Sequence, residues 1–315
     1  MTDTLGNGWA DPIGGHEALR RHAPAAAGVL DELTGAVAAD RRWVALARSW
    51  CATTLDLAPL SGPSGATEAE AMLLPRTSLS EREQTLARFC EQYSVDVSAI
   101  DDALRDELAE TLGEGLTEAH GHFVTMTYVA DFVPRVRATL DRLFPLTPGD
   151  WPDPGEHEVD DAMPLALEFV RVVYNHQELD PILTELVRLR GARAHNCRLC
   201  KSLRSRSSLE AGATEHDFAS IDEYENAELQ ADQKAALALA DAIIWQPARI
   251  PERVVDDVRA SLRPAQAVEL VLDVMRNAWN KTMVTVAVDE PNVASGFQVY
   301  EFNADGTLDF APTGA

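Results

Sequence analysis

Residues suited to thiol chemistry gather in one central segment of the chain. Cys197 and Cys200 form a Cys-x-x-Cys pair, Glu185 precedes Cys197 by twelve residues, and Arg204 follows Cys200 by four. Cysteines three residues apart lie on the same side of a helical turn, close enough to form a disulfide or to share a metal ion. The segment therefore has the residues for a dithiol and disulfide cycle.

A thiol attacks a peroxide or a disulfide as its thiolate, so its pKa must fall below the ordinary value of about 8.5. We expect Asn196 to be a helix N-cap, because it would put Cys197 in a first turn where free backbone N–H groups favour an anion. Glu185 is the candidate to move a proton. The surrounding positive charge favours a thiolate and suits an anionic substrate or partner. We call residues 185–206 the basic segment. Its charged residues are one acidic residue, Glu185, and seven basic residues: Arg188, Arg190, Arg193, Arg198, Lys201, Arg204 and Arg206.

The same residues have plainer interpretations. A single Cys-x-x-Cys is compatible with thiol redox chemistry, with half of a zinc site or with inert core thiols. Structural zinc takes four protein ligands, and only His195 lies near the pair, so we expect neither a metal nor a cofactor. His195 could orient a thiol or cap a neighbouring carbonyl. Glu185 could be a helix residue paired with Arg188 at i+3 spacing.

The spacing resembles the core of the alkylhydroperoxidase D-like proteins in the carboxymuconolactone decarboxylase superfamily. Their pattern is Glu, eleven residues, Cys-x-x-Cys, three residues, His; the Glu and both cysteines match, and Arg204 stands in place of the His. The resemblance covers about residues 160–290 and, in degenerate form, residues 25–145. It implies an all-α fold, commonly assembled into homo-oligomers, and reduction of hydroperoxides.

Carried over by position, the resemblance makes Cys200 the peroxide-attacking thiol and Cys197 the resolving thiol, which an external thiol reductant protein regenerates. Glu185 would belong to a proton relay, with Arg204 and His195 in support. Arginine does not deprotonate near neutral pH, so Arg204 could stabilise a thiolate or bind an anion but could not shuttle protons.

The expected function is thus a thiol-dependent peroxidase or disulfide reductase. One alternative is the lactone decarboxylase-like branch of the same superfamily, which does not rely on a Cys-x-x-Cys. Another is a noncatalytic helical scaffold or interaction protein in which the cysteines are structural.

Composition limits the partners. The net charge is −24, from 51 acidic and 27 basic residues, which disfavours binding to nucleic acid or to anionic membranes. The N-terminus lacks the basic start and apolar segment of a signal peptide, and no run of 18 apolar residues occurs. We therefore expect a cytoplasmic protein, where a cysteine pair favours redox or metal chemistry over a structural bridge. Cys51 and Cys90 are isolated in apolar helical surroundings.

Periodic apolar residues predict the helices that would position the segment. A capping box is expected at Ser80 and Glu83, and a kink at Pro134. Asp180 and Pro181 should begin the helix of Glu185 as N-cap and N1. The expected helices cover about residues 25–60, 80–93, 100–112, 116–144, 162–174, 180–190, 231–245, 251–262 and 264–279.

The helix of Glu185 must end before the cysteines. Twelve residues of one helix would separate Glu185 from Cys197 by about 18 Å of rise, too far for proton transfer. Gly191 and Asn196 are the expected breaks, so that two helices pack side by side.

Five segments are expected: a flexible arm (1–24), a degenerate helical repeat (25–145), a Pro-rich linker (146–158), the alkylhydroperoxidase D-like core with the cysteine pair (159–290) and a C-terminal tail (291–315). Similar strings recur at an offset of roughly 150 residues, which suggests two tandem repeats. Leu55 and Ala58 would then stand where Cys197 and Cys200 stand, so the first copy has lost its cysteines. The tail should form a short β-hairpin around an Ala-Asp-Gly turn.

Overall fold

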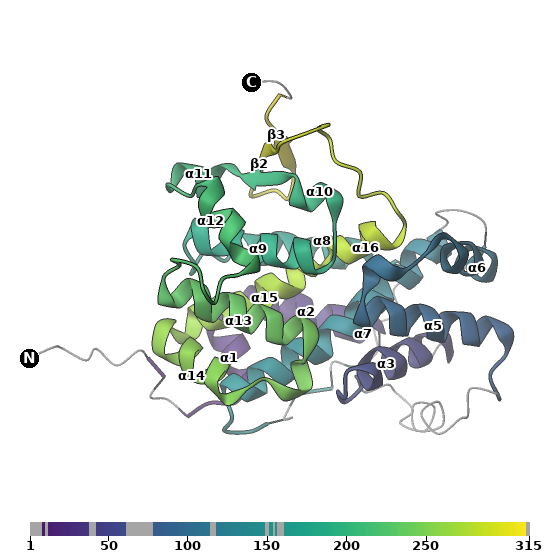
Figure 1. Ribbon diagram of the computed structural model, residues 1–315. Coiled ribbons are helices and arrows are strands. Elements are labelled where there is room, and N and C mark those ends of the chain that lie inside the picture. Colours follow the sequence, from purple (N-terminus) through teal and green to yellow (C-terminus); the bar gives the residue numbers. More distant parts are fainter. Residues whose placement is uncertain are drawn as a thin grey trace, which may run out of the picture.

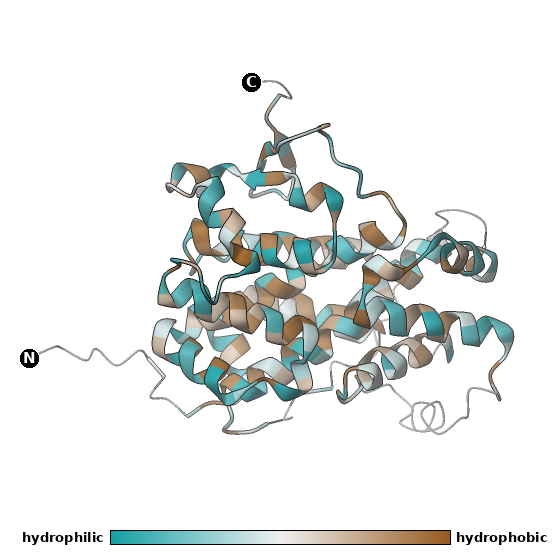
Figure 2. Ribbon diagram, viewed as in Figure 1, coloured by the Kyte–Doolittle hydropathy of each residue, from teal (hydrophilic) through white to brown (hydrophobic). Residues whose placement is uncertain are grey.

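Helices make up most of the computed structural model, which describes residues 8–9, 12–37, 42–60, 78–113, 118–148, 151–153, 155 and 161–312 (Figure 1). Apolar and polar residues occupy different faces of these helices, as expected when each buries one face (Figure 2). The first half contains α1 (Gly15–His22), α2 (Pro24–Val37), α3 (Arg42–Thr54), α5 (Glu81–Val95), η2 (Val97–Ala99), α6 (Asp102–Leu112) and α7 (Glu118–Leu143). The second contains α8 (Met163–Tyr174), α9 (Pro181–Ala194), α10 (Arg198–Lys201), β1 (Leu203–Ser205), α11 (Arg206–Glu210), α12 (Glu215–Ala219), η3 (Ser220–Asp222), α13 (Ala231–Trp245), η4 (Pro247–Arg249), α14 (Glu252–Ser261), α15 (Pro264–Ala278), α16 (Asn280–Thr285), β2 (Gln298–Phe302) and β3 (Leu308–Phe310).

Local signals set many of these boundaries. Ser80 and Glu83 form the expected capping box at the start of α5. Asp180 caps α9 by accepting the N–H groups of Ile182 and Leu183, and Pro181 occupies N1. Pro134 lies inside α7. The predicted starts of α5 and α9 are thus confirmed.

The two halves repeat one order of elements. The helices α5, η2 and α6 begin at Glu81, Val97 and Asp102, and their counterparts α13, η4 and α14 each begin 150 residues later. A long helix follows in each half, α7 or α15. This shared order is what an internal duplication predicts.

A buried charge cluster joins the halves at corresponding positions. The Arg135 guanidinium on α7 donates to the carbonyls of Ser94, at 2.9 Å, and Ile244, at 2.6 Å, which lie 150 residues apart. It also pairs with Asp131, whose second oxygen accepts the Lys281 amine at 2.7 Å. Apolar residues from both halves form one large core around the cluster, and a smaller separate cluster in the second half includes Leu186, Phe218 and Leu237.

The ends of α3 and α9 share a backbone motif. Asp56 and Asn196 both have positive φ, at 58° and 53°. After each, an N–H bonds back to the carbonyl five residues earlier, from Leu57 to Ala52 and from Cys197 to Ala192. If the halves are copies, this motif would align Leu57 and Leu60 with the two cysteines, whereas the sequence strings align Leu55 and Ala58 with them.

Three further predictions from the sequence concern the N-terminal arm, the C-terminal hairpin and the linker. Part of the 1–24 arm is helix α1, which packs against α7 and α15, so a loosely attached arm is wrong for that part. The predicted hairpin of β2 and β3 is confirmed, but β1 pairs parallel with β2, so the protein is mainly helical with a three-stranded sheet. Of the linker 146–158, residues 149–150, 154 and 156–158 lie outside the described residues.

Candidate functional site

Asn196 creates the break between Glu185 and the cysteines. It takes the left-handed conformation that ends α9, while Gly191, the other expected break, lies inside α9. Asn196 therefore cannot also be the extended N-cap of the next helix. Cys197 is that N-cap, and its Sγ accepts the backbone N–H of Cys200 at 3.2 Å. The expectation of Asn196 as N-cap is wrong for this reason.

The two thiols have different environments. Cys197 is fully buried, whereas Cys200 is partly exposed, and the thiols share a hydrogen bond. That bond, together with burial, raises the pKa of Cys197. It lowers the pKa of Cys200, aided by the Arg188 charge and a hydrogen bond from Asn280, against burial and the Asp289 charge. Cys200 is thus the thiol that ionises more readily.

Arg188 connects Glu185 to the backbone at Cys200. Its guanidinium forms a two-bond ion pair with Glu185, at 2.6 and 2.7 Å, and donates to the carbonyl of Cys200 at 2.9 Å. Glu185 is buried on α9 and also accepts the Ser205 N–H at 3.0 Å and the Tyr300 hydroxyl at 3.4 Å. Its described hydrogen bonds therefore reach the cysteines only through Arg188.

Asn280, at the start of α16, links His195 to Cys200. His195 is buried at the C-cap of α9, and its Nδ1 lies 2.8 Å from Asn280 Oδ1. Burial, reinforced by the Lys281 charge, lowers the pKa of His195 to about 3, so the ring is neutral and its Nδ1–H is the donor. The Asn280 amide then donates to Cys200. The described hydrogen bonds thus connect His195 to Cys200 through Asn280.

Arg204 has other partners. It is largely buried, pairs with both carboxylate oxygens of Glu215 at 2.8 and 3.0 Å, and donates to the carbonyls of Lys201 and Leu203. The rings of Phe218 and Phe297 flank its guanidinium at 5.3 Å each. Its described bonds hold the chain after the cysteines together, and the cation beside Cys200 is Arg188.

Carboxylates neutralise the basic segment, so it is not an open cationic surface. Six of its arginines each form an ion pair, most with a carboxylate from outside the segment. The pairs are Arg188 with Glu185, Arg190 with Asp241, Arg193 with Asp222, Arg198 with Asp289, Arg204 with Glu215 and Arg206 with Glu301.

The C-terminal region supplies site residues that the sequence pattern missed. Asp289 accepts the N–H of Arg198 at 2.8 Å, and its backbone carbonyl accepts the N–H of Leu199, also at 2.8 Å. It thereby fixes the first turn of α10. Tyr300 reaches Glu185 from β2. Asn280, Asp289 and Tyr300 lie 80 or more residues after Cys200 in the chain, so no local spacing could have revealed them.

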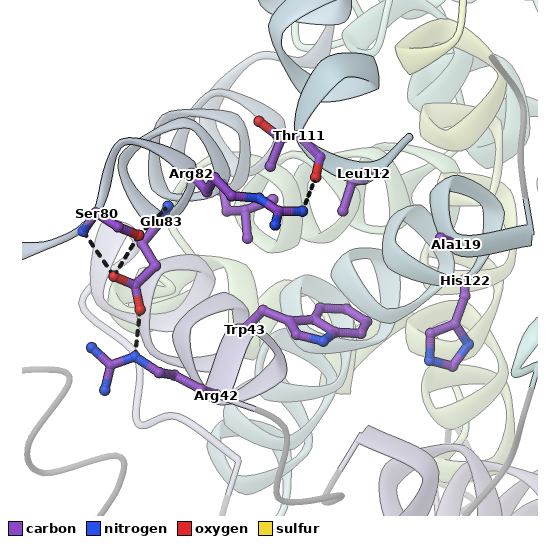
Figure 3. A pocket seen from close by; sticks show the side chains of 10 residues that line it. Arg42, Trp43, Ser80, Arg82, Glu83, Thr111, Leu112, Ala119 and His122 are labelled. Carbon is purple, nitrogen blue, oxygen red and sulfur yellow. Dashed lines mark hydrogen bonds and ion pairs between the residues drawn. The ribbon is translucent and has the colours of Figure 1, made fainter. Parts of the chain in front are cut away.

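A separate cavity of about 780 Å³ lies in the first half, between α3, α5, α6 and α7 (Figure 3). Trp43 and His122 lie on its wall, while Arg82 donates to the Thr111 carbonyl at its edge. None of its lining residues belongs to the cysteine segment.

Within the described ranges, no three or more His, Cys, Asp or Glu side chains are grouped to hold a metal ion. No helix in the same ranges is both long and apolar enough to cross a bilayer.

The fold and the site define a mainly helical protein with a dithiol at the junction of two helices. The chain is 40% identical over 299 residues to two Mycobacterium tuberculosis proteins, the uncharacterized protein Rv2313c of strain H37Rv and the uncharacterized protein MT2376 of strain CDC 1551; each match covers 91% of this chain and 99% of the relative. The chain therefore belongs to the family of these proteins. No family model and no solved structure matches it.

Proposed function

We propose that the protein is a thiol-dependent peroxidase or disulfide reductase whose Cys197 and Cys200 cycle between dithiol and disulfide. The observation that carries the proposal is the asymmetry of the pair. The partly exposed Cys200 has a lowered pKa and hydrogen-bonds the fully buried Cys197, whose pKa is raised. An accessible thiolate with a protonated thiol beside it is what an attacking and a resolving cysteine require.

The reaction with a hydroperoxide then has two steps. The Cys200 thiolate attacks the outer oxygen of ROOH, the O–O bond breaks, and the alcohol leaves with a proton from water, so that Cys200 becomes a sulfenic acid. The Cys197 thiol attacks that sulfur, the S–O bond breaks, and water leaves as the disulfide forms. An external dithiol reduces the disulfide by exchange and is itself oxidised.

The neighbouring residues bind and orient the reacting thiol. Arg188 and Asn280 stabilise the Cys200 thiolate, while Glu185 holds Arg188 in position. We assign Glu185 this positioning role in place of direct proton acceptance, because Arg188, Ser205 and Tyr300 already donate to its oxygens. Solvent at the exposed side of Cys200 takes the thiol proton.

The wider expectations belong to the same proposal. The repeated element order and the shared helix-end motif support two tandem alkylhydroperoxidase D-like repeats, of which the first has leucines at the cysteine positions. A cytoplasmic setting would keep the dithiol reduced between turnovers, and a protein dithiol would be the reductant. We also propose a homo-oligomer.

A turnover assay tests the function. Purified protein should consume hydrogen peroxide or an organic hydroperoxide when a regenerating dithiol, such as a thioredoxin system, is present. Cys200→Ala should abolish rapid consumption, and Cys197→Ala should leave a single rapid oxidation that stops at the Cys200 sulfenic acid. Cys90→Ala is the matched control. It removes a buried thiol outside the Cys197–Cys200 pair and should keep the rapid rate of hydroperoxide consumption.

The strongest rival is a noncatalytic helical scaffold. Its support is the buried Glu185–Arg188 ion pair, which would also serve to hold α9 against the chain after the cysteines. Thiol titration separates the two: a scaffold predicts a Cys200 thiol of ordinary pKa and no peroxide consumption with any dithiol.

A further inference from the structure

The first half contains a second pair of thiols that lie far apart in the sequence. Cys51 is on α3 and Cys90 is on α5, and these helices pack against each other. Both side chains are fully buried, and the two thiols share a hydrogen bond. Two cysteines that appear isolated in the sequence are therefore in contact in the fold.

Some polar groups lie near this pair within the apolar core. The Thr127 side chain on α7 hydrogen-bonds Cys90. The Lys281 ammonium and the Asp131 carboxylate, themselves paired at 2.7 Å, both interact electrostatically with the thiols, while burial and the hydrogen bond to Cys51 raise the pKa of Cys90. The pair is thus not in the purely apolar setting typical of inert core cysteines.

The second half has no thiols at the corresponding positions. The register fixed by Asp56 and Asn196 aligns Cys51 with Gly191, and the 150-residue offset of α5 and α13 aligns Cys90 with Ala240. Small residues suffice for that helix contact, so close packing alone does not require sulfur at both sites.

We propose that Cys51 and Cys90 form a second redox-active dithiol, which a small hydroperoxide converts to a disulfide joining α3 to α5. The Cys51 thiolate attacks the outer oxygen of ROOH, the O–O bond breaks, and the alcohol leaves with a proton from water. The Cys90 thiol then attacks the Cys51 sulfenic acid, the S–O bond breaks, and water leaves. One hydroperoxide is reduced for the two electrons that the thiols lose.

The cavity in the first half supplies the approach. Leu86 lines it, and Cys90 follows Leu86 by four residues, about 6 Å further along α5. The rings of Phe89 and Phe123, 5.6 Å apart, belong to the same core around the pair. Oxidation must wait for local opening of these side chains, so it should be roughly 10²-fold slower than oxidation of the partly exposed Cys200.

The Cys197→Ser/Cys200→Ser protein tests the proposal, because it retains Cys51 and Cys90 alone. The protein is treated with hydrogen peroxide for a prolonged time, unfolded and alkylated. Neither thiol should then be alkylated, and peptide mapping without reductant should find the peptide of Cys51 linked to that of Cys90 by a disulfide. Adding Cys90→Ala should remove the cross-link and leave a Cys51 sulfenic acid that a 1,3-dione probe traps. Alanine is the suitable replacement because Ala240 occupies the aligned position.

Two results would overturn the proposal: both thiols still free after the prolonged treatment, or each thiol oxidised singly without a cross-link. Either result is distinguishable from failure of the proposed function, because the tested variant lacks the Cys197–Cys200 pair. If Cys51→Ala or Cys90→Ala weakens the fold, the Cys197→Ser/Cys200→Ser protein alone still decides between cross-link and free thiols.

Discussion

Replacing Asn280 with alanine should raise the pKa of Cys200. Asn280 Oδ1 accepts the Nδ1–H of His195 at 2.8 Å, an arrangement that leaves the amide N–H groups to donate toward the thiol. A hydrogen bond to a charged group contributes about 1.5–3 kcal/mol. Because one pKa unit corresponds to about 1.4 kcal/mol, the loss should raise the Cys200 pKa by about one to two units.

The pH dependence of alkylation measures this pKa directly. Iodoacetamide labelling of the peptide that contains Cys200 is followed by mass spectrometry from pH 5 to pH 10, in a Cys197→Ala background so that no disulfide forms. Asn277→Ala is the matched control. Its amide nitrogen lies on the preceding helix and has no hydrogen-bond partner among the described residues, so its loss should leave the midpoint unchanged.

An unchanged Cys200 midpoint in a folded Asn280→Ala protein would refute the assignment of Asn280 as a thiolate donor. An equal shift in Asn277→Ala would refute it too, because the effect would then be a general consequence of altered packing. Asn280→Gln offers a rescue test, since it keeps the amide and should recover part of the shift.

Three further substitutions test the neighbouring assignments. Glu185→Gln leaves its buried arginine partner uncompensated and should lower the free energy of unfolding by about 3–5 kcal/mol in denaturant titrations, whereas a loss below about 1 kcal/mol would mean that the pair is not structural. Arg204→Ala should lower stability but leave the Cys200 alkylation midpoint in place; a higher midpoint would restore the electrostatic role that the family resemblance implies. Burial lowers the pKa of His195 to about 3, so the unfolded state alone binds this proton as the pH falls below about 6.5. Stability should therefore fall by up to about 1.4 kcal/mol per pH unit there, and His195→Gln, but not His216→Gln at an exposed position, should flatten that slope; superimposable pH profiles would contradict it.

Local sequence signals predicted the helices and one part of the site. Strong apolar periodicity and capping residues set the bounds of α13 and the start of α9, because both act within a few residues. The need to break the helix between Glu185 and Cys197 followed from helical rise alone. Asn196 makes that break, as a left-handed residue that ends α9.

Local sequence patterns do not predict the long-range contacts of the site. Asn280 and Asp289 reach the cysteine pair only after the chain has folded back, and Cys51 meets Cys90 through the packing of two helices. The charge count of the basic segment was also misleading, since carboxylates far along the chain, such as Asp241, neutralise it. No spacing rule covers such contacts, because the tertiary fold alone determines them.

The most direct test of the central claim is to map the first disulfide that the protein forms. The reduced wild type is treated with one equivalent of hydrogen peroxide, quenched within seconds by alkylation in denaturant so that every free thiol reacts, and digested without reductant. We predict a link between Cys197 and Cys200, with Cys51 and Cys90 still alkylated at that time. Four alkylated cysteines, or a first link that omits Cys200, would contradict the proposed dithiol cycle.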